Sequence, residues 1–532
     1  MIILSAQLYT PLYDFRKVEV KSLLLSSQLL MMRSSLKLKK LLILFSAPLF
    51  LTLDLAAQKA GIFEGRSDVG DVLHPGTISY TKDNQQYELS GSGANIWFKH
   101  DELNFAWKQL KGNFILQARG VLLGKGADPH RKFGWMVRSS LDSTSSMVCA
   151  TVHGDGLTAL QYRKTTHTDV EETRSSLKGP DVIQLERKGN LYIMSVAHYG
   201  ETYVTENVSD LNMGEEVYAG IFICAHNKDV VEKVSFDNVR IIIPAKENFV
   251  PYKDYLGSSI ELMDVNNGSR QVVYTASESL QAPNWTRDGK SLIYNSKGYI
   301  YRFDLNKHTP QIVNTETVVK NNNDHVISFN GKMLGLSATG ADAKNGSLIY
   351  TVPIEGGKPK QITPAGPSYL HGWSPDGRYL VFTGQRNNEF DIYKVPSNGG
   401  EEVRLTTATG LDDGAEFSPD GKFIYFNSTR SGSMQLWRMK PDGTLQEQLT
   451  NDEYNNWFPH VSPDGRNIVF LSFTKDIKPD EHPFYKHVYL RMMPVNGKQS
   501  TVLAYLYGGQ GSINTPSWSP DSRRIAFISN SD

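Results

Sequence analysis

The chain has 532 residues, with 56 Lys and Arg against 56 Asp and Glu, so its formal net charge is zero. This balance gives no basic surface for nucleic acid and no cationic surface for an anionic membrane, which disfavours both as partners. Two cysteines exclude a disulfide framework, so a chain of this length must be stabilised by hydrophobic cores.

The N-terminal segment, residues 1–57, has the layout of a secretory signal peptide. Basic side chains in the segment 33–40 precede an apolar run at 41–53, and small residues follow it up to Ala57. We therefore expect cleavage after Ala57 and export to the periplasm or the cell envelope.

Two features of this segment allow alternatives: the position of the start codon, and whether the apolar run is a signal peptide or a membrane anchor. Met31 or Met32 makes a better start than Met1, because a signal peptide begins shortly before its basic residues. A transmembrane anchor is the alternative to a cleaved signal, but about 13 apolar residues are too few to cross a bilayer. We expect no stable membrane span after cleavage.

Residues 61–244 are predicted to form a β-sandwich or jelly roll. Short β-rich segments separated by turn residues recur at 114–118, 135–138, 147–152, 157–162, 182–185, 191–196, 217–222 and 230–236. Short strands at this spacing are typical of two packed antiparallel sheets. Cys149 and Cys224 fall inside two of these apolar segments. We expect buried thiols there, with a disulfide between them as the alternative.

From residue 257 to residue 532 the chain repeats one pattern six times: a large hydrophobic residue, a tight turn and an apolar strand. The turns begin at Thr286, Ser328, Ser374, Ser418, Ser462 and Ser519, and three of them read Ser-Pro-Asp-Gly. Their Asp or Asn residues recur at intervals of 42, 46, 44, 44 and 57 residues. A period near 44 residues with strand-like content predicts a six-bladed β-propeller, so the whole chain is predicted to be all-β.

The turns and the strand count predict how the propeller is built. Asp376, Asp420 and Asp464 are expected to be architectural, because Pro and Gly preset the dihedral angles of a tight turn in which Asp is tolerated. The outer strand pair at 260–274 has no inner pair before it. It should complete the blade that 518–528 begins, which closes the ring and leaves no open sheet edge.

These repeats, together with outer strands such as Ile392-Tyr393-Lys394-Val395, resemble the propeller of the TolB family over residues 257–532. The resemblance implies a protein-interaction platform in the cell envelope. The same blades occur in peptidases and lyases, so the motifs predict the fold more firmly than the function.

The region before the propeller departs from the TolB family, whose members carry a small α/β domain there. Patterns such as Gly134-x-Met136-x-Arg138 and Leu185-Glu186-Arg187 resemble concanavalin-like sandwich domains instead. Such domains often accompany carbohydrate-active proteins, so this resemblance implies a contact with a glycan.

Candidate site residues are expected along the propeller channel. Side chains alternate along a strand, so the residue before each turn hydrophobe should face the channel. These residues are Asn284, Val326, Gly372, Glu416, His460 and Ser517. Glu416 and His460 should therefore lie side by side, with His325 and His371 one step further up and Asp413 in an approach loop.

This His/Glu/Asp group has three interpretations. It can hold water as part of the structure, bind a ligand, or act as an acid/base pair. If it binds a divalent metal, the candidate ligands are His460, Glu416 and His371. The sequence requires no cofactor.

The 57-residue interval contains about 13 extra residues, which we place in the loop 474–486 as either a binding lip or an ordinary solvated loop. The sequence has no Gly-x-Ser-x-Gly nucleophile elbow and no phosphate-binding loop. We therefore expect an exported, non-catalytic scaffold that binds an envelope protein or a glycan. A metal-dependent polysaccharide lyase, or another carbohydrate-active enzyme that uses the channel, is the alternative.

Overall fold

The computed structural model describes residues 59–250, 252–340, 346–497 and 499–532. The predicted signal peptide at 1–57 lies outside the described residues. The described residues belong to one compact unit and form strands, so the all-β prediction is confirmed. Among them, no helix is long and apolar enough to span a membrane.

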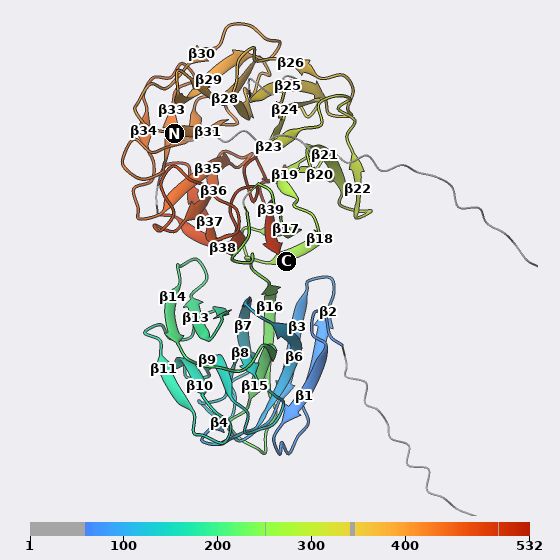
Figure 1. The fold of residues 1–532 in the computed structure, drawn as a ribbon, viewed down its shortest axis with the longest axis vertical. Helices are drawn as coiled ribbons and strands as arrows, with labels where there is room; N and C mark the ends of the chain where they lie inside the picture. The colour runs from blue at the N-terminus through green and yellow to red at the C-terminus, as the bar shows by residue number, and fades with distance from the viewer. Residues whose placement is uncertain (1–58, 251, 341–345, 498) are drawn as a thin grey trace, which may run out of the picture. The chain divides into compact units, whose positions relative to one another are not determined.

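Two seven-stranded antiparallel sheets precede the propeller (Figure 1). The first sheet has the order β1 (Gly65–Val69), β6 (Leu103–Lys111), β15 (Glu216–Cys224), β8 (Lys132–Arg138), β9 (Met147–His153), β10 (Thr158–Arg163) and β11 (Glu171–Arg174). The second has the order β14 (Val204–Val208), β13 (Leu191–Ala197), β12 (Val182–Lys188), β7 (Phe114–Leu123), β16 (Glu232–Ile242), β3 (Gln86–Gly91) and β2 (Thr77–Thr81). A short ribbon pairs β4 (Ile96–Trp97) with β5 (His100–Asp101).

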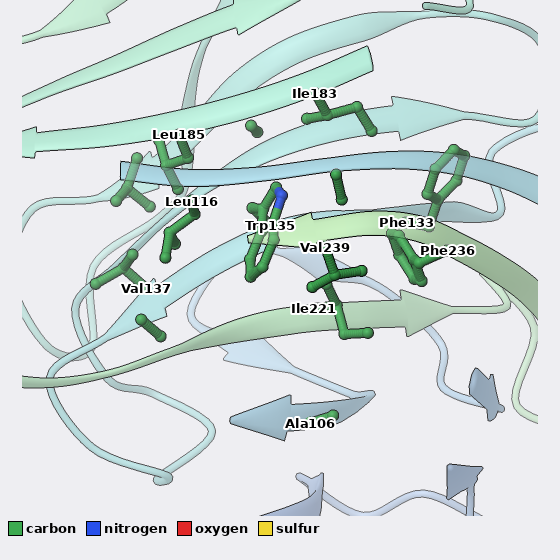
Figure 2. Packing of buried hydrophobic residues seen from close by; sticks show 14 of the residues in the cluster. Ala106, Leu116, Phe133, Trp135, Val137, Ile183, Leu185, Ile221, Phe236 and Val239 are labelled. Atoms are coloured by element: carbon green, nitrogen blue, oxygen red, sulfur yellow. The ribbon is translucent and has the colours of Figure 1, made fainter. Parts of the chain in front are cut away.

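One hydrophobic cluster is shared by these two sheets (Figure 2). Trp135 and Ile221 come from the first sheet, whereas Leu116, Leu185 and Phe236 come from the second, and all five are fully buried. Burying each such side chain contributes about 1.5–3 kcal/mol, which makes this cluster the main source of stability for the region. The boundaries 61–244 and the concanavalin-like resemblance stay predictions.

Cys149 and Cys224 are free, buried thiols, so the first of the two alternatives is correct. Strand β8 lies between their strands β9 and β15. Burial raises the pKa of Cys149 to about 12 and that of Cys224 to about 11. Both groups are therefore protonated and unreactive at neutral pH.

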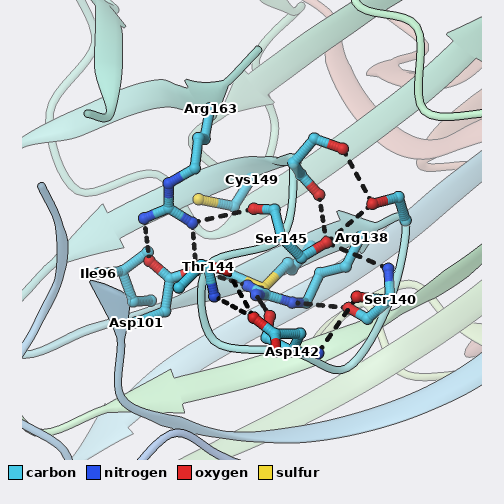
Figure 3. Close-up of polar contacts among 12 residues, drawn as sticks. Ile96, Asp101, Arg138, Ser140, Asp142, Thr144, Ser145, Cys149 and Arg163 are labelled. Atoms are coloured by element: carbon cyan, nitrogen blue, oxygen red, sulfur yellow. Dashed lines mark hydrogen bonds and ion pairs between the residues drawn. The ribbon is translucent and has the colours of Figure 1, made fainter. Parts of the chain in front are cut away.

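A buried ion-pair network lies beside Cys149 (Figure 3). The Asp101 carboxylate accepts a hydrogen bond of 2.7 Å from Arg138 and bonds of 2.8 and 2.6 Å from Arg163. All three side chains are fully buried. A buried charge requires partners, and here one carboxylate joins strands β8 and β10 to the short β4–β5 ribbon.

The propeller has five four-stranded blades and one composite blade, which follow one another in chain order around a ring (Figure 1). Blades 1 and 2 contain β19 (Gln281–Trp285), β20 (Ser291–Ser296), β21 (Tyr299–Asp304), β22 (Thr309–Ile312), β23 (Asn321–Ile327), β24 (Met333–Thr339), β25 (Ser347–Pro353) and β26 (Lys360–Gln361). Blades 3 and 4 contain β27 (Ser368–Trp373), β28 (Tyr379–Arg386), β29 (Glu389–Pro396), β30 (Val403–Arg404), β31 (Asp412–Phe417), β32 (Ile424–Ser428), β33 (Gln435–Met439) and β34 (Glu447–Gln448). Blade 5 contains β35 (Asn455–Val461), β36 (Asn467–Phe473), β37 (Lys486–Pro494) and β38 (Thr501–Gly508).

The turn aspartates are architectural, as predicted. In the first Ser-Pro-Asp-Gly turn the Asp376 carboxylate accepts hydrogen bonds from the Ser374 hydroxyl at 2.6 Å and from the Arg378 amide at 3.0 Å. Gly377 adopts a φ of 73°, which side chains disfavour. The same hydroxyl–carboxylate bond recurs at Asp420 and Asp464.

The sixth blade closes the ring in the predicted way. It contains β39 (Arg524–Ser531), β17 (Gly257–Asp264) and β18 (Arg270–Ala276), so the end of the chain pairs with the start of the propeller. All eight residues of β17 pair antiparallel with β39, and Trp518 adds an isolated bridge to Ile525. The pairing of β17 with β39 therefore joins the two ends of the ring.

Glu261 of β17 ties the closing strand to the two N-terminal sheets. Its buried carboxylate pairs with Arg240 of β16 at 2.7 Å and with Arg270 of β18 at 2.9 Å. It also accepts a bond of 2.6 Å from the Ser529 hydroxyl of β39. Burial would raise the pKa of Glu261, but the two guanidinium groups outweigh burial and hold this pKa well below its usual range.

Ring closure predicts that removing residues 517–532 is severely destabilising. The deletion exposes the edge of β17 and the apolar face of the neighbouring blade. We expect aggregation in size-exclusion chromatography or a melting temperature lower by more than about 10 °C. Deleting Asp532 alone, beyond β39, is the control. A 517–532 deletion that melts like the full chain would refute closure.

Candidate functional site

The inner strands of the four-stranded blades all contain a β-bulge. The register with the second strand shifts between the pairs Gln281/Asn284, Asn321/His325, Leu370/Gly372, Asp413/Glu416 and Trp457/His460. Ala282, Gly414 and Phe458 adopt φ values of 55°, 68° and 55° inside these bulges. A bulge re-aims the side chains around it, so residues before and after it reach different parts of the channel. Strict alternation does not predict this division.

Glu416 and His460 form a closed pair, side by side as expected. His460 Nδ1 lies 2.6 Å from Glu416 Oε2, and His460 Nε2 lies 2.6 Å from the carbonyl oxygen of Ile513. The Val461 amide donates to the other Glu416 oxygen at 3.3 Å. Both ring nitrogens of His460 are therefore engaged, so this pair joins neighbouring blades and leaves no imidazole nitrogen for a metal.

Four of the residues predicted to face the channel line a small cavity. Asn284, Val326, Gly372 and Glu416 surround about 40 Å³ together with hydrophobic residues that include Trp373. This volume has room for only a few water molecules. Water retention is the role that this part of the channel supports.

Asn284 and His325 hold blades together. The Asn284 amide nitrogen donates to the carbonyl of Pro516, and its oxygen accepts a bond of 3.0 Å from the Ile327 amide. His325 Nε2 lies 3.2 Å from a backbone carbonyl oxygen of blade 1, and burial lowers the pKa of His325 to about 4. Neither residue lines the larger cavity that contains His371.

A larger cavity, of about 550 Å³, contains the remaining two candidates, His371 and Asp413. We call it the His371 cavity. Its polar and charged lining includes Asp324, His371, Asp413, Asp480, His482 and Gln510. Its aromatic lining consists of Tyr252, Tyr369, Phe390 and Phe458. Side chains from several blades and from three connecting segments therefore converge here.

An ion pair forms the centre of the His371 cavity. His371 Nε2 lies 3.0 Å from Asp413 Oδ1. The same carboxylate oxygen accepts bonds of 2.6 Å from the Thr383 hydroxyl and 2.7 Å from the Gly414 amide. The position of the Asp413 carboxylate is thus fixed before any ligand arrives.

The two buried carboxyl groups of the cavity have opposite pKa shifts. Burial would raise the pKa of Asp413, but His371 outweighs burial and lowers this pKa to about 2. Burial opposes the charging of His371, yet Asp413 raises the pKa of His371 above its usual value. For Asp324 burial dominates and raises the pKa to about 7, although the His371 charge acts in the other direction. Near neutral pH one carboxyl is charged and the other is titrating.

The loop 474–486 forms part of the cavity wall. Its His482 ring packs against Trp457 with centroids 4.5 Å apart, and both Asp480 and His482 line the cavity. Further along, the Tyr485 hydroxyl accepts a bond of 3.0 Å from the Leu256 amide, at the start of the propeller. The loop is therefore part of the cavity wall, and its role as a binding lip stays a prediction.

The comparisons with known proteins agree with this architecture. The PD40 TolB β-propeller domain matches residues 366–478. The uncharacterized protein Atu1656 of Agrobacterium fabrum is 42% identical over 272 residues, which are 51% of this chain and 92% of that protein. The chain belongs to the TolB-like β-propeller family.

Solved structures extend this family assignment. A structure described as TolB of Agrobacterium tumefaciens shares 41% identity with a TM-score of 0.50, and the match covers 52% of this chain and all of that one. TolB of Acinetobacter baumannii shares 20% identity with a TM-score of 0.38, over 48% of this chain and 64% of that one. The family match at residues 366–478 and the Agrobacterium tumefaciens structure confirm the TolB-like resemblance inferred from the repeats.

Some members of the His371 cavity were missed by sequence reasoning in this TolB-like propeller. Asp324 stands directly before His325 on the same inner strand, and only the bulge decides which of the two reaches the cavity. His482 lies in the extra loop, where the repeat length signals an insertion but not the path of the chain. Gln510 follows the last strand of blade 5 and has no repeat equivalent to mark it.

The raised pKa of Asp324 predicts a pH-dependent stability. Between pH values of about 4 and 7 the folded protein holds a proton that the unfolded chain, with an aspartate pKa of 3.8, has released. The free energy of unfolding should therefore fall as pH rises through this range. We expect the free energy of unfolding to drop by about 2–4 kcal/mol less between pH 4.5 and pH 8 in Asp324→Asn than in the wild type. Urea unfolding at the two pH values measures this difference.

Asp229→Asn, at an exposed aspartate between β15 and β16, is the control for this measurement. Its free energy of unfolding should match that of the wild type at both pH values. Equal stability differences between Asp324→Asn and the wild type at both pH values would contradict the raised pKa.

Proposed function

We propose that this chain is an exported, non-catalytic binding protein of the cell envelope, whose propeller holds a basic segment of a protein partner in the His371 cavity. One observation carries the proposal: the cavity lining contains three aspartates and two histidines but no Lys or Arg among its described residues. Such a lining favours a ligand that brings positive charge and hydrogen-bond donors.

The geometry suits an ammonium or guanidinium group. Carboxylates form their strongest hydrogen bonds with charged donors, and the two oxygens of one carboxylate match the fork of an arginine side chain. Tyr252, Tyr369 and Phe390 add ring faces that attract cations. A volume of about 550 Å³ accommodates one or two long side chains of a partner but not a folded domain.

The lyase alternative fits this lining poorly. A polysaccharide lyase acts on uronate sugars, whose carboxylates would meet Asp413 and Asp480 without a compensating Lys or Arg in the wall. Of the metal ligands proposed for that mechanism, His460 and Glu416 bond to each other, and His371 Nε2 lies 3.0 Å from Asp413. A glycan contact by the N-terminal sheets is a separate proposal that rests on the concanavalin-like resemblance.

The test uses arrays of basic, neutral and acidic peptides of equal length, probed with the purified chain at two salt concentrations. We expect retention of basic peptides only, and weaker retention at high salt. Asp480→Lys reverses an exposed charge in the cavity wall, and it should lower the affinity for basic peptides at least tenfold, or about 1.4 kcal/mol.

Asp442→Lys is the matched control, because it reverses an exposed charge between β33 and β34, away from the cavity. It should bind like the wild type. Equal retention of acidic peptides, or unchanged binding by Asp480→Lys, would overturn the proposal. Binding of a neutral glycan in a parallel array would favour the carbohydrate interpretation instead.

A further inference from the structure

Three histidines gather at one end of β15, β8 and β9, the three central strands of the first seven-stranded sheet. Lys132 at the start of β8 pairs with Cys224 at the end of β15 and with His153 at the end of β9. His226 follows β15, and His130 precedes β8, so the strand order β15-β8-β9 brings all three rings together. The ring centroid of His130 lies 5.9 Å from that of His153 and 5.3 Å from that of His226.

The backbone around these rings is fixed. The Asp155 amide, in the turn after β9, donates a bond of 2.8 Å to the carbonyl of Pro129, in the loop that carries His130. That loop is anchored by Arg131, whose buried guanidinium lies 2.6 Å from the Glu232 carboxylate. The His130 loop and the Asp155 turn are therefore held against each other by the fold.

His153 is the member that the fold alone does not explain. His153 is only 5% exposed, and neither of its ring nitrogens has a hydrogen-bond partner among the described residues. Leaving a buried polar group without a partner costs about 1–3 kcal/mol. His130, His153 and Asp155 each offer one ligand atom, and these three atoms lie within 4.8 Å of one another.

We infer that His130, His153 and Asp155 bind a divalent cation of the zinc class at this end of the central strands. Two imidazoles and one carboxylate are ligands for zinc and its transition-metal neighbours, whereas calcium and magnesium take sets of oxygen ligands. The cation would supply the partner that the buried His153 ring lacks. The nearby His226 ring lies 3.2 Å from Asp128 and completes a polar surrounding for the site.

The three groups can close around such an ion without moving the backbone. A tetrahedral zinc site places its ligand atoms about 3.4 Å apart. His130 Nδ1 and Asp155 Oδ2 are already 3.7 Å apart, and these two side chains are 49% and 38% exposed, so they are free to rotate toward the buried His153. Three protein ligands would leave a fourth position for water or for a group from a partner.

The test is zinc titration of the full chain after chelator treatment, in a form without an affinity tag, by calorimetry. We expect one Zn²⁺ per chain with a Kd below about 1 µM, and no response to Ca²⁺. His130→Ala removes a ligand whose side chain is half exposed, and it should weaken binding at least tenfold. His153→Gln should do the same, and Co²⁺ should give visible absorption bands that both variants lose.

His198→Ala is the matched control, because His198 forms another exposed His–Asp pair, at 3.8 Å from Asp181. It should bind Zn²⁺ like the wild type. The inference is overturned if the wild type binds no Zn²⁺ at 100 µM, or if His130→Ala and His153→Gln bind it like the wild type. It is equally overturned if binding is lost only in His371→Ala, which would place the metal in the propeller.

Discussion

The pairing of β39 with β17 is the constraint on which the rest of this structure depends. A propeller blade buries its faces only against neighbouring blades, so an open ring would expose two sheet edges and an apolar face. The closing strand also carries Glu261, which is buried between Arg240 and Arg270 and joins the ring to the N-terminal sheets. One strand thus completes the ring and anchors the region that precedes it.

Closure also creates the His371 cavity. Asp324, His371 and Asp413 come from three successive blades, and His482 comes from the loop of a fourth. None of these blades forms the cavity alone, and the inner strands converge only in a closed ring. The bulges then separate two roles within one channel: residues after them, such as Glu416, join blades, while residues within them or directly before them, such as His371 and Asp413, line the cavity.

Two of the His/Asp clusters among the described residues differ in their chemistry. The His371 cavity is acidic, and its His371 imidazole pairs with Asp413, which suits a cationic ligand. The cluster around His153 instead contains an imidazole without a partner among the described residues, which suits a metal. A metal ion found on the purified protein would therefore not by itself indicate an enzyme site in the propeller. It could instead be bound by the His153 cluster, which lies in a separate part of the chain.

The sequence by itself determined the period, the turns, the blade count and the closure, because a Ser-Pro-Asp-Gly turn is a local structure and its spacing counts blades directly. It also determined that Glu416 and His460 lie side by side, since equivalent positions in successive repeats are neighbours in a ring. Only the tertiary structure decided that Asp324 reaches the cavity while His325 does not, because a bulge shifts the register by two residues between Asn321 and His325. Likewise, His130 and His153 meet only through the order of three strands, which depends on long-range pairing that local patterns do not encode.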